Sequence, residues 1–144
     1  MRTNVAFRHS AEFVSLAEED GILAVGGAAW FVALLERVPG LQREAELCQE
    51  DWGVVVFVAR NRKRFWVGLS AWPEGEHAWL AHIHHRSLPW LQRLTSSGKA
   101  ELQRLASDFD AVLAGEPSVS SIEWYREGEM AKSNPHAAAN PTEA

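Results

Sequence analysis

Four histidines crowd into one short stretch, and they are the residues whose spacing most strongly suggests chemistry. The run His82-Ile83-His84-His85 follows His77 near the end of an alternating segment. Side chains two residues apart on a β-strand point to the same face about 7 Å apart, so His82 and His84 predict paired imidazoles. Such a pair is a common basis for a zinc site, with His77 or His85 as the third ligand. The alternative, which we favour, is that His82 and His84 are hydrogen-bonded sheet residues at a strand end.

The remaining polar motifs do not form a catalytic set. Cys48 is the only cysteine, which excludes an intramolecular disulfide, and its acidic neighbours disfavour a reactive thiolate. Gly26-Gly27 lacks the lysine and the hydroxyl residue of a phosphate-binding loop. We interpret the basic run from Arg60 to Arg64 as a solvated hairpin tip. No catalytic residue is therefore expected and, apart from the zinc alternative, no cofactor.

Three residues are instead predicted to contact a partner. Glu44 and Glu46 share one face of the alternating segment 41–48, which predicts an edge strand with a wet, acidic side. Trp72 stands beside Pro73 in a turn, where we expect its side chain to be partly exposed. Because tryptophan is enriched among the residues that dominate protein–protein binding energies, Trp72 is a candidate contact.

The elements that must position these residues are strands and two helices. Alternating or wholly apolar runs predict strands, the first of them at a sheet edge, over residues 3–9, 41–48, 54–59, 64–71, 76–85 and 119–126. The short connections at 61–63 and 73–75 are hairpin turns, so the central strands form an antiparallel meander. Apolar residues at helical spacing predict the main helices around 28–38 and 98–114.

The expected fold is an α+β domain, with an antiparallel β-meander of five or six strands and two main helices packed on it. Residues 1–127 are expected to form a single domain, and the small, polar segment 128–144 a disordered tail. The pattern leaves open whether the first helix starts before or after Gly26-Gly27. Because the central strands are apolar on both faces, both faces need a cover, from a helix or from a second copy of the chain.

Composition narrows the classes of function. The chain has 144 residues, a net charge of −5, and seven tryptophans against one tyrosine. Broad nucleic-acid binding usually needs a basic face, so a nucleic-acid partner is not expected. The N-terminal residues lack the apolar run of a signal peptide, and the apolar stretch 22–35 is too short to span a membrane. We therefore expect a cytoplasmic bacterial protein that does not enter a membrane.

One set of hairpin motifs resembles a known group of proteins. The motifs are the turn 50–53 (EDWG), the strand 54–59 (VVVFVA), residues 65–68 (FWVG) and the later Trp79. They are similar to small bacterial α+β proteins in which an E-D-W-G turn opens an antiparallel hairpin. Some proteins of that build resemble immunity proteins, which bind and block a toxin. The resemblance covers about residues 28–85 and implies no catalytic residue.

These observations support two functions of different classes. The first is a non-enzymatic protein-binding domain, in its narrower form an immunity-type protein whose acidic residues Glu44 and Glu46 face a basic toxin. The second is a metal-binding protein or metal-dependent enzyme that uses His82 and His84. A homodimer formed through one face of the sheet is a further arrangement, because it would supply the second cover.

Overall fold

The computed structural model describes residues 2–10, 25–71, 77–86 and 96–126, which contain seven strands and two helices. In chain order these are β1 (Arg2–His9), α1 (Val25–Glu36), β2 (Gln42–Arg43), β3 (Cys48–Glu50), β4 (Gly53–Arg60), β5 (Lys63–Ala71), β6 (Ala78–His85), α2 (Ser96–Ala114) and β7 (Val119–Arg126). The turn expected at 73–75 and the tail expected at 128–144 lie outside the described residues.

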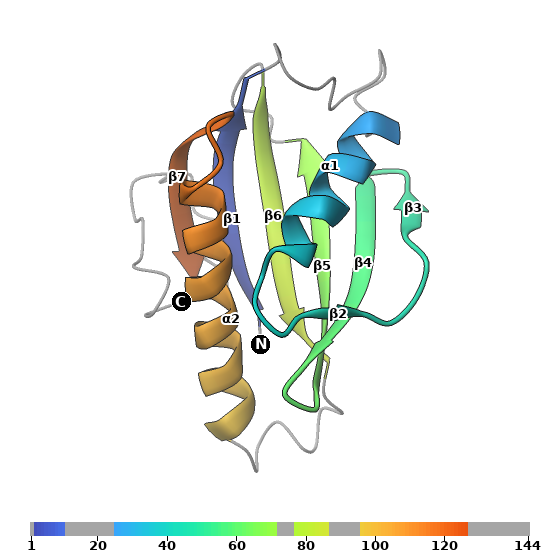
Figure 1. Ribbon diagram of the computed structural model, residues 1–144, viewed down its shortest axis with the longest axis vertical. Helices are drawn as coiled ribbons and strands as arrows, with labels where there is room; N and C mark the ends of the chain where they lie inside the picture. The colour runs from blue at the N-terminus through green and yellow to red at the C-terminus, as the bar shows by residue number, and fades with distance from the viewer. Residues whose placement is uncertain (1, 11–24, 72–76, 87–95, 127–144) are drawn as a thin grey trace.

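All strands join one antiparallel sheet in the order β2-β4-β5-β6-β1-β7, and β3 pairs with β4 beside β2 (Figure 1). Strands β4, β5 and β6 form the predicted meander, and the α+β architecture with two helices is confirmed. The β4–β5 turn is made by Asn61 and Arg62, whose φ angles are 50° and 64°. Positive φ at both positions is typical of the two-residue turn whose twist matches that of the paired strands.

Two strand predictions are wrong. β1 does not lie at an edge, because it pairs with β6 on one side and β7 on the other. The segment 41–48 is not one strand either, since only its ends belong to β2 and β3. Between the pairs Arg43↔Val58 and Cys48↔Val55, β4 advances three residues while the edge segment advances five. The extra residues bulge out of the sheet edge, a feature that discourages edge-to-edge pairing.

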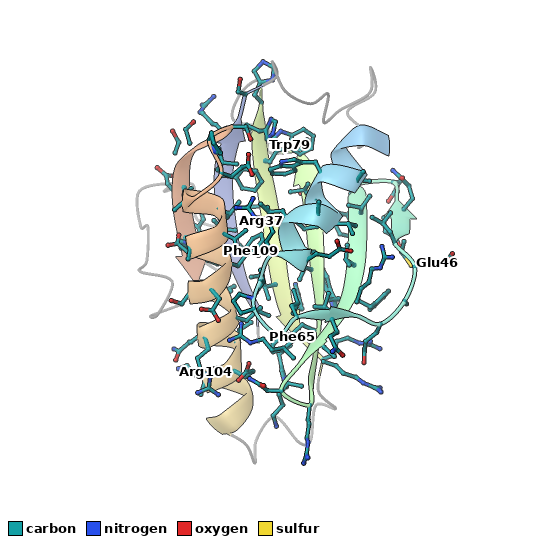
Figure 2. All side chains as sticks on the ribbon, in the orientation of Figure 1. Arg37, Glu46, Phe65, Trp79, Arg104 and Phe109 are labelled. Atoms are coloured by element: carbon teal, nitrogen blue, oxygen red, sulfur yellow. The ribbon has the colours of Figure 1, made fainter. Side chains whose placement is uncertain are left out.

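Both helices cover the same face of the sheet (Figure 1), and the main core lies between these two layers. Figure 2 shows Phe65, Trp79 and Phe109 among the side chains of this core, where all three are buried. Among the described residues α1 runs from Val25, so the helix already includes Gly26-Gly27. The opposite face of the sheet receives neither helix, and this face carries the candidate site.

An ion-pair cluster around the buried Glu101 joins the β4–β5 hairpin to α2. The Glu101 carboxylate, only 2% exposed as a residue, lies 3.2 Å from Arg60 Nε and 2.8 Å from Arg104 Nη2. Arg60 also pairs with Asp108, and the Asn61 amide donates to Glu101 at 3.2 Å. The interpretation of residues 60–64 as a wholly solvated tip is therefore wrong at Arg60, which anchors the hairpin to the helix.

Candidate binding face

Aromatic and imidazole side chains gather on the sheet face opposite the helices. The strand register places Phe57 of β4 opposite Trp66 of β5, and Trp66 opposite His84 of β6. Directly paired residues in antiparallel strands project to the same face, so these three side chains form one row across the sheet. The Trp66 and His84 rings are stacked, with centroids 3.8 Å apart and planes inclined by 13°.

Trp52 lies beside this row and completes what we call the aromatic face: Trp52, Phe57, Trp66, His82 and His84. A Cβ built on Gly68 would lie 2.9 Å from Trp52 Cη2, so the indole sits directly over this glycine. Its ring meets His82 edge-on, at a centroid distance of 6.1 Å. The Trp52 side chain nevertheless stays 43% exposed, the one large apolar residue of the described part in that state. A glycine in the strand thus fixes a half-exposed tryptophan in place.

A chain of polar contacts fixes the His82 ring. His82 Nδ1 lies 2.8 Å from Asn4 Oδ1, and Nε2 lies 3.5 Å from the Ser70 hydroxyl. In the tautomer that fits, Nδ1 donates to Asn4, and Nε2 accepts from Ser70. The order of serine, histidine and amide resembles a nucleophile, its base and an orienting group. However, β5 pairs with β4 and β6 on both sides, which engages the surrounding amides that an oxyanion would need.

The four predicted metal ligands do not converge. His82 and His84 share the aromatic face, as expected, but the His82 nitrogens already have protein partners and the His84 ring is stacked. His85 lies on the helix-covered face against Phe65, and His77 is exposed in the turn before β6, with a φ of 63°. Within the described ranges, no three histidine, cysteine, aspartate or glutamate side chains gather closely enough to hold a metal ion.

His85 instead belongs to the core beneath α2. Its ring packs edge-on against Phe65 at 5.2 Å, and its Cε1 lies 3.0 Å from the point where Gly98 would carry a Cβ. Neither ring nitrogen has a hydrogen-bond partner. Burial lowers the pKa of His85, and the positive charge of Lys63 acts in the same direction. Burial also lowers the pKa of His9, whose ring meets Trp30 of α1 at 4.6 Å.

An open hollow lies at one end of the aromatic face, lined by Glu44, Ala45, Phe57, Arg64 and Arg86. The Arg86 guanidinium lies over the Phe57 ring, 4.9 Å from its centroid. Glu44 Oε1 lies 3.3 Å from Arg64 Nε, and Glu44 Oε2 lies 4.0 Å from Arg86 Nη1. The hollow therefore combines an aromatic floor with two guanidinium groups and one carboxylate.

The three predicted partner contacts have different surroundings. Glu44 is paired with two arginines rather than standing as an open acidic group. Glu46 is exposed on the bulge between β2 and β3, at the margin of the molecule in Figure 2. Trp72 lies outside the described residues. Both glutamates are thus exposed, but Glu44 is ion-paired within the hollow, while Glu46 stands on the bulge.

Sequence reasoning missed Asn4 and Arg86 as members of this face. The row from Phe57 to Trp66 follows from the two-residue turn, because the turn sets the register of its hairpin. The contact of Asn4 with His82 depends on β1 lying beside β6, and these strands are 78 residues apart at this pair. No local signal in the sequence reports such a pairing.

Comparison with known proteins gives no relative to which the chain could be assigned. It matches no protein-family model, and no curated protein or solved structure is similar to it. Among the helices of the described residues, none combines the length and the apolar character that crossing a membrane requires. Function must therefore be argued from the site itself.

Proposed function

We propose that this chain is a non-enzymatic protein-binding domain of the bacterial cytoplasm, and that its partner docks on the aromatic face. The observation that supports the proposal is Trp52, whose indole is 43% exposed and held over Gly68. A tryptophan fixed before binding loses little conformational entropy when a partner covers it, and its contact area is large. Tryptophan and arginine are also the residues enriched at binding hot spots, and both occur here.

In the narrower form of the proposal, the partner is a toxin and the domain is an immunity-type protein. The resemblance carried by the 50–53 turn and its hairpin supports this form. Glu46 is exposed and directly follows Glu44 and Ala45, which line the hollow, so its carboxylate would add a polar rim contact. A second copy of the chain is the other protein partner, since a homodimer would cover Trp52 in both protomers.

Site-specific photo-crosslinking tests the proposal in producing cells. A benzophenone amino acid replaces Asp51, the exposed neighbour of Trp52, in one variant and Ala111, an exposed residue on the helix side, in a matched control. We expect a protein adduct of one defined mass from position 51 and none from position 111. Mass spectrometry of the adduct then separates a toxin, another protein and a second copy of the chain.

Two outcomes would contradict the proposal. One is the absence of any protein adduct at position 51 in cells that contain the complete set of native proteins. The other is the same set of adducts at positions 51 and 111, because random collision would then explain the labelling. A circular dichroism spectrum matching that of the wild type confirms that each variant is folded.

A further inference from the structure

The hollow beside the aromatic face indicates the chemistry of the partner, and this inference rests on the proposed function. Arg64 and Arg86 line the hollow, and Phe57 forms part of its wall. Phe57 is the cross-strand partner of Trp66, so the hollow continues directly into the aromatic row. A segment lying across the sheet would therefore meet guanidinium groups and aromatic rings side by side.

The guanidinium groups of Arg64 and Arg86 have more N–H donors than Glu44 can engage. Of the described acidic residues, Glu44 alone pairs with Arg64 and Arg86, at 3.3 Å and 4.0 Å. Each guanidinium carries five N–H donors, which one shared carboxylate cannot satisfy. The side chains of Arg64 and Arg86 remain 67% and 43% exposed. A second carboxylate can therefore reach the same two cations.

Charge and geometry both favour such a ligand. The whole chain carries a net charge of −5, whereas the hollow holds two arginines and one glutamate. Arg86 is held over the Phe57 ring, so its planar group is already oriented before a ligand arrives. Arginine binds carboxylates through parallel hydrogen bonds, and fixing its plane lowers the entropic cost of forming them.

We propose that the hollow binds a carboxylate side chain of a partner protein, while an apolar side chain of the same segment packs on Trp66 and Trp52. The partner is thus an acidic and apolar segment. The sequence pattern suggests a basic toxin as the partner, with Glu44 and Glu46 as its contacts. The partner segment proposed here has the opposite charge. Glu44 then acts as an internal competitor, since its carboxylate occupies the two guanidinium groups that the partner needs.

Because Glu44 competes with the partner's carboxylate, the proposal predicts that replacing Glu44 raises the affinity for the partner. The direction of this change in affinity is the test. The probe is a random-peptide phage library selected on the immobilised full chain, followed by calorimetric titration of the enriched synthetic peptides. We expect these peptides to carry aspartate or glutamate beside an aromatic or branched aliphatic residue. Arg86→Ala should weaken their binding about tenfold, as expected for loss of a charge-assisted hydrogen bond. Glu44→Gln should strengthen it about threefold, because an exposed ion pair of modest strength is removed.

Two matched variants serve as controls. Glu36→Gln removes an exposed carboxylate at the end of α1, on the helix side of the sheet, and should leave the peptide affinity unchanged. Arg37→Ala removes an exposed guanidinium of the α1 end, paired with Glu116, and should also leave it unchanged. Trp52→Ala should abolish peptide binding, since it removes the central contact of the proposed function.

The outcomes separate this inference from the function on which it rests. Peptides that need Trp52 but carry no acidic residue and ignore Arg86→Ala would overturn the carboxylate site and leave the binding face standing. Enrichment of basic peptides whose binding is weakened by Glu44→Gln would overturn the carboxylate site and indicate a basic partner instead. Stronger binding of single-stranded oligothymidylate than of any peptide would replace the protein partner with a nucleic acid. No enriched peptide, or binding insensitive to Trp52→Ala, would overturn both proposals.

Discussion

The two faces of the sheet differ in what covers them, although alternate residues of the same strands build both. On the helix-covered face, Phe65, Val67 and Leu69 of β5 are completely buried. On the aromatic face, Trp66 of the same strand is half-buried and stacked on His84. At β5 the helix-covered face is thus fully buried, whereas the aromatic face keeps ring surface partly exposed, as the proposed binding function requires.

The ion pairs on the two sides of the sheet also differ in burial. Glu101 on the helix side is almost fully buried and shared between Arg60 and Arg104. Glu44 beside the aromatic face makes longer contacts with two exposed arginines. Buried pairs are strongly coupled to folding, whereas exposed pairs contribute little and exchange easily. The exposed cluster around Glu44 can therefore exchange partners at little cost in stability, as the proposed binding role requires.

The largest expected effect compares one phenylalanine from each face. Phe65→Ala should destabilise the fold by about 3–5 kcal/mol, because it empties a fully buried site. Phe57→Ala should cost only about 1 kcal/mol, since Phe57 is half-buried and mainly supports Arg86. Urea unfolding of the two variants measures the difference, and equal losses would show that the aromatic face is part of the core.

A glutamate pair sharpens the same contrast. Glu101→Ala should destabilise the fold by about 3 kcal/mol, because Arg60 then keeps only Asp108 as an ion-pair partner in a buried position. Glu44→Ala should change the free energy of unfolding by less than about 1 kcal/mol. Chemical denaturation of both variants at one salt concentration tests this, and a large loss for Glu44→Ala would contradict the binding role of its cluster.

Two glycines on neighbouring strands near Trp52, Gly53 of β4 and Gly68 of β5, are expected to respond differently to substitution. A Cβ at Gly53 would lie 2.0 Å from the Leu69 carbonyl oxygen, which cannot move away, so Gly53→Ala should cost about 2–3 kcal/mol. At Gly68 the nearest atom is the end of the Trp52 ring, at 2.9 Å. Gly68→Ala should therefore cost less than about 1 kcal/mol but expel the indole. Thermal melts and a red shift of the tryptophan emission report the two effects, and unchanged emission would contradict the packing.

Acidification should lower the free energy of unfolding through the histidines buried on the helix-covered face. Burial lowers the folded-state pKa of His85 and His9, while the unfolded chain binds protons near a pKa of about 6.5. The stability present above this value is therefore lost as the pH falls through the folded-state values. His85→Phe should flatten the dependence of the unfolding free energy on pH, and Phe65→Leu, which changes the ring packed against His85 without removing a titratable group, serves as the control. A slope identical in wild type and His85→Phe would contradict the assignment.

Zinc should have the smallest effect. Both nitrogens of His82 already have partners, and His85 faces the opposite side of the sheet. Adding zinc to the chelator-treated protein is therefore expected to leave its melting temperature unchanged. Stoichiometric zinc by elemental analysis, lost in a His82→Ala/His84→Ala variant, would instead establish the metal-binding alternative.

Local patterns in the sequence determined the elements and part of the face. The hairpin turn at Asn61 and Arg62 fixes the register of β4 and β5, and with it the neighbourhood of Phe57 and Trp66. The helices were predictable for the same reason, since the spacing of their apolar residues repeats within a few turns. Each of these signals lies within about a dozen residues, where backbone geometry alone relates sequence to space.

The tertiary structure alone decided which strands meet and which face receives the helices. β1 lies between β6 and β7, and so brings Asn4 to His82 across 78 residues of chain. Both helices pack on one face, although the strands' apolar residues would suit a cover on either side. Such choices depend on the summed packing of all elements rather than on any local pattern. For that reason the sequence shows only that the chain is rich in tryptophan, whereas the fold shows that the Trp52 indole is held in place with its surface exposed.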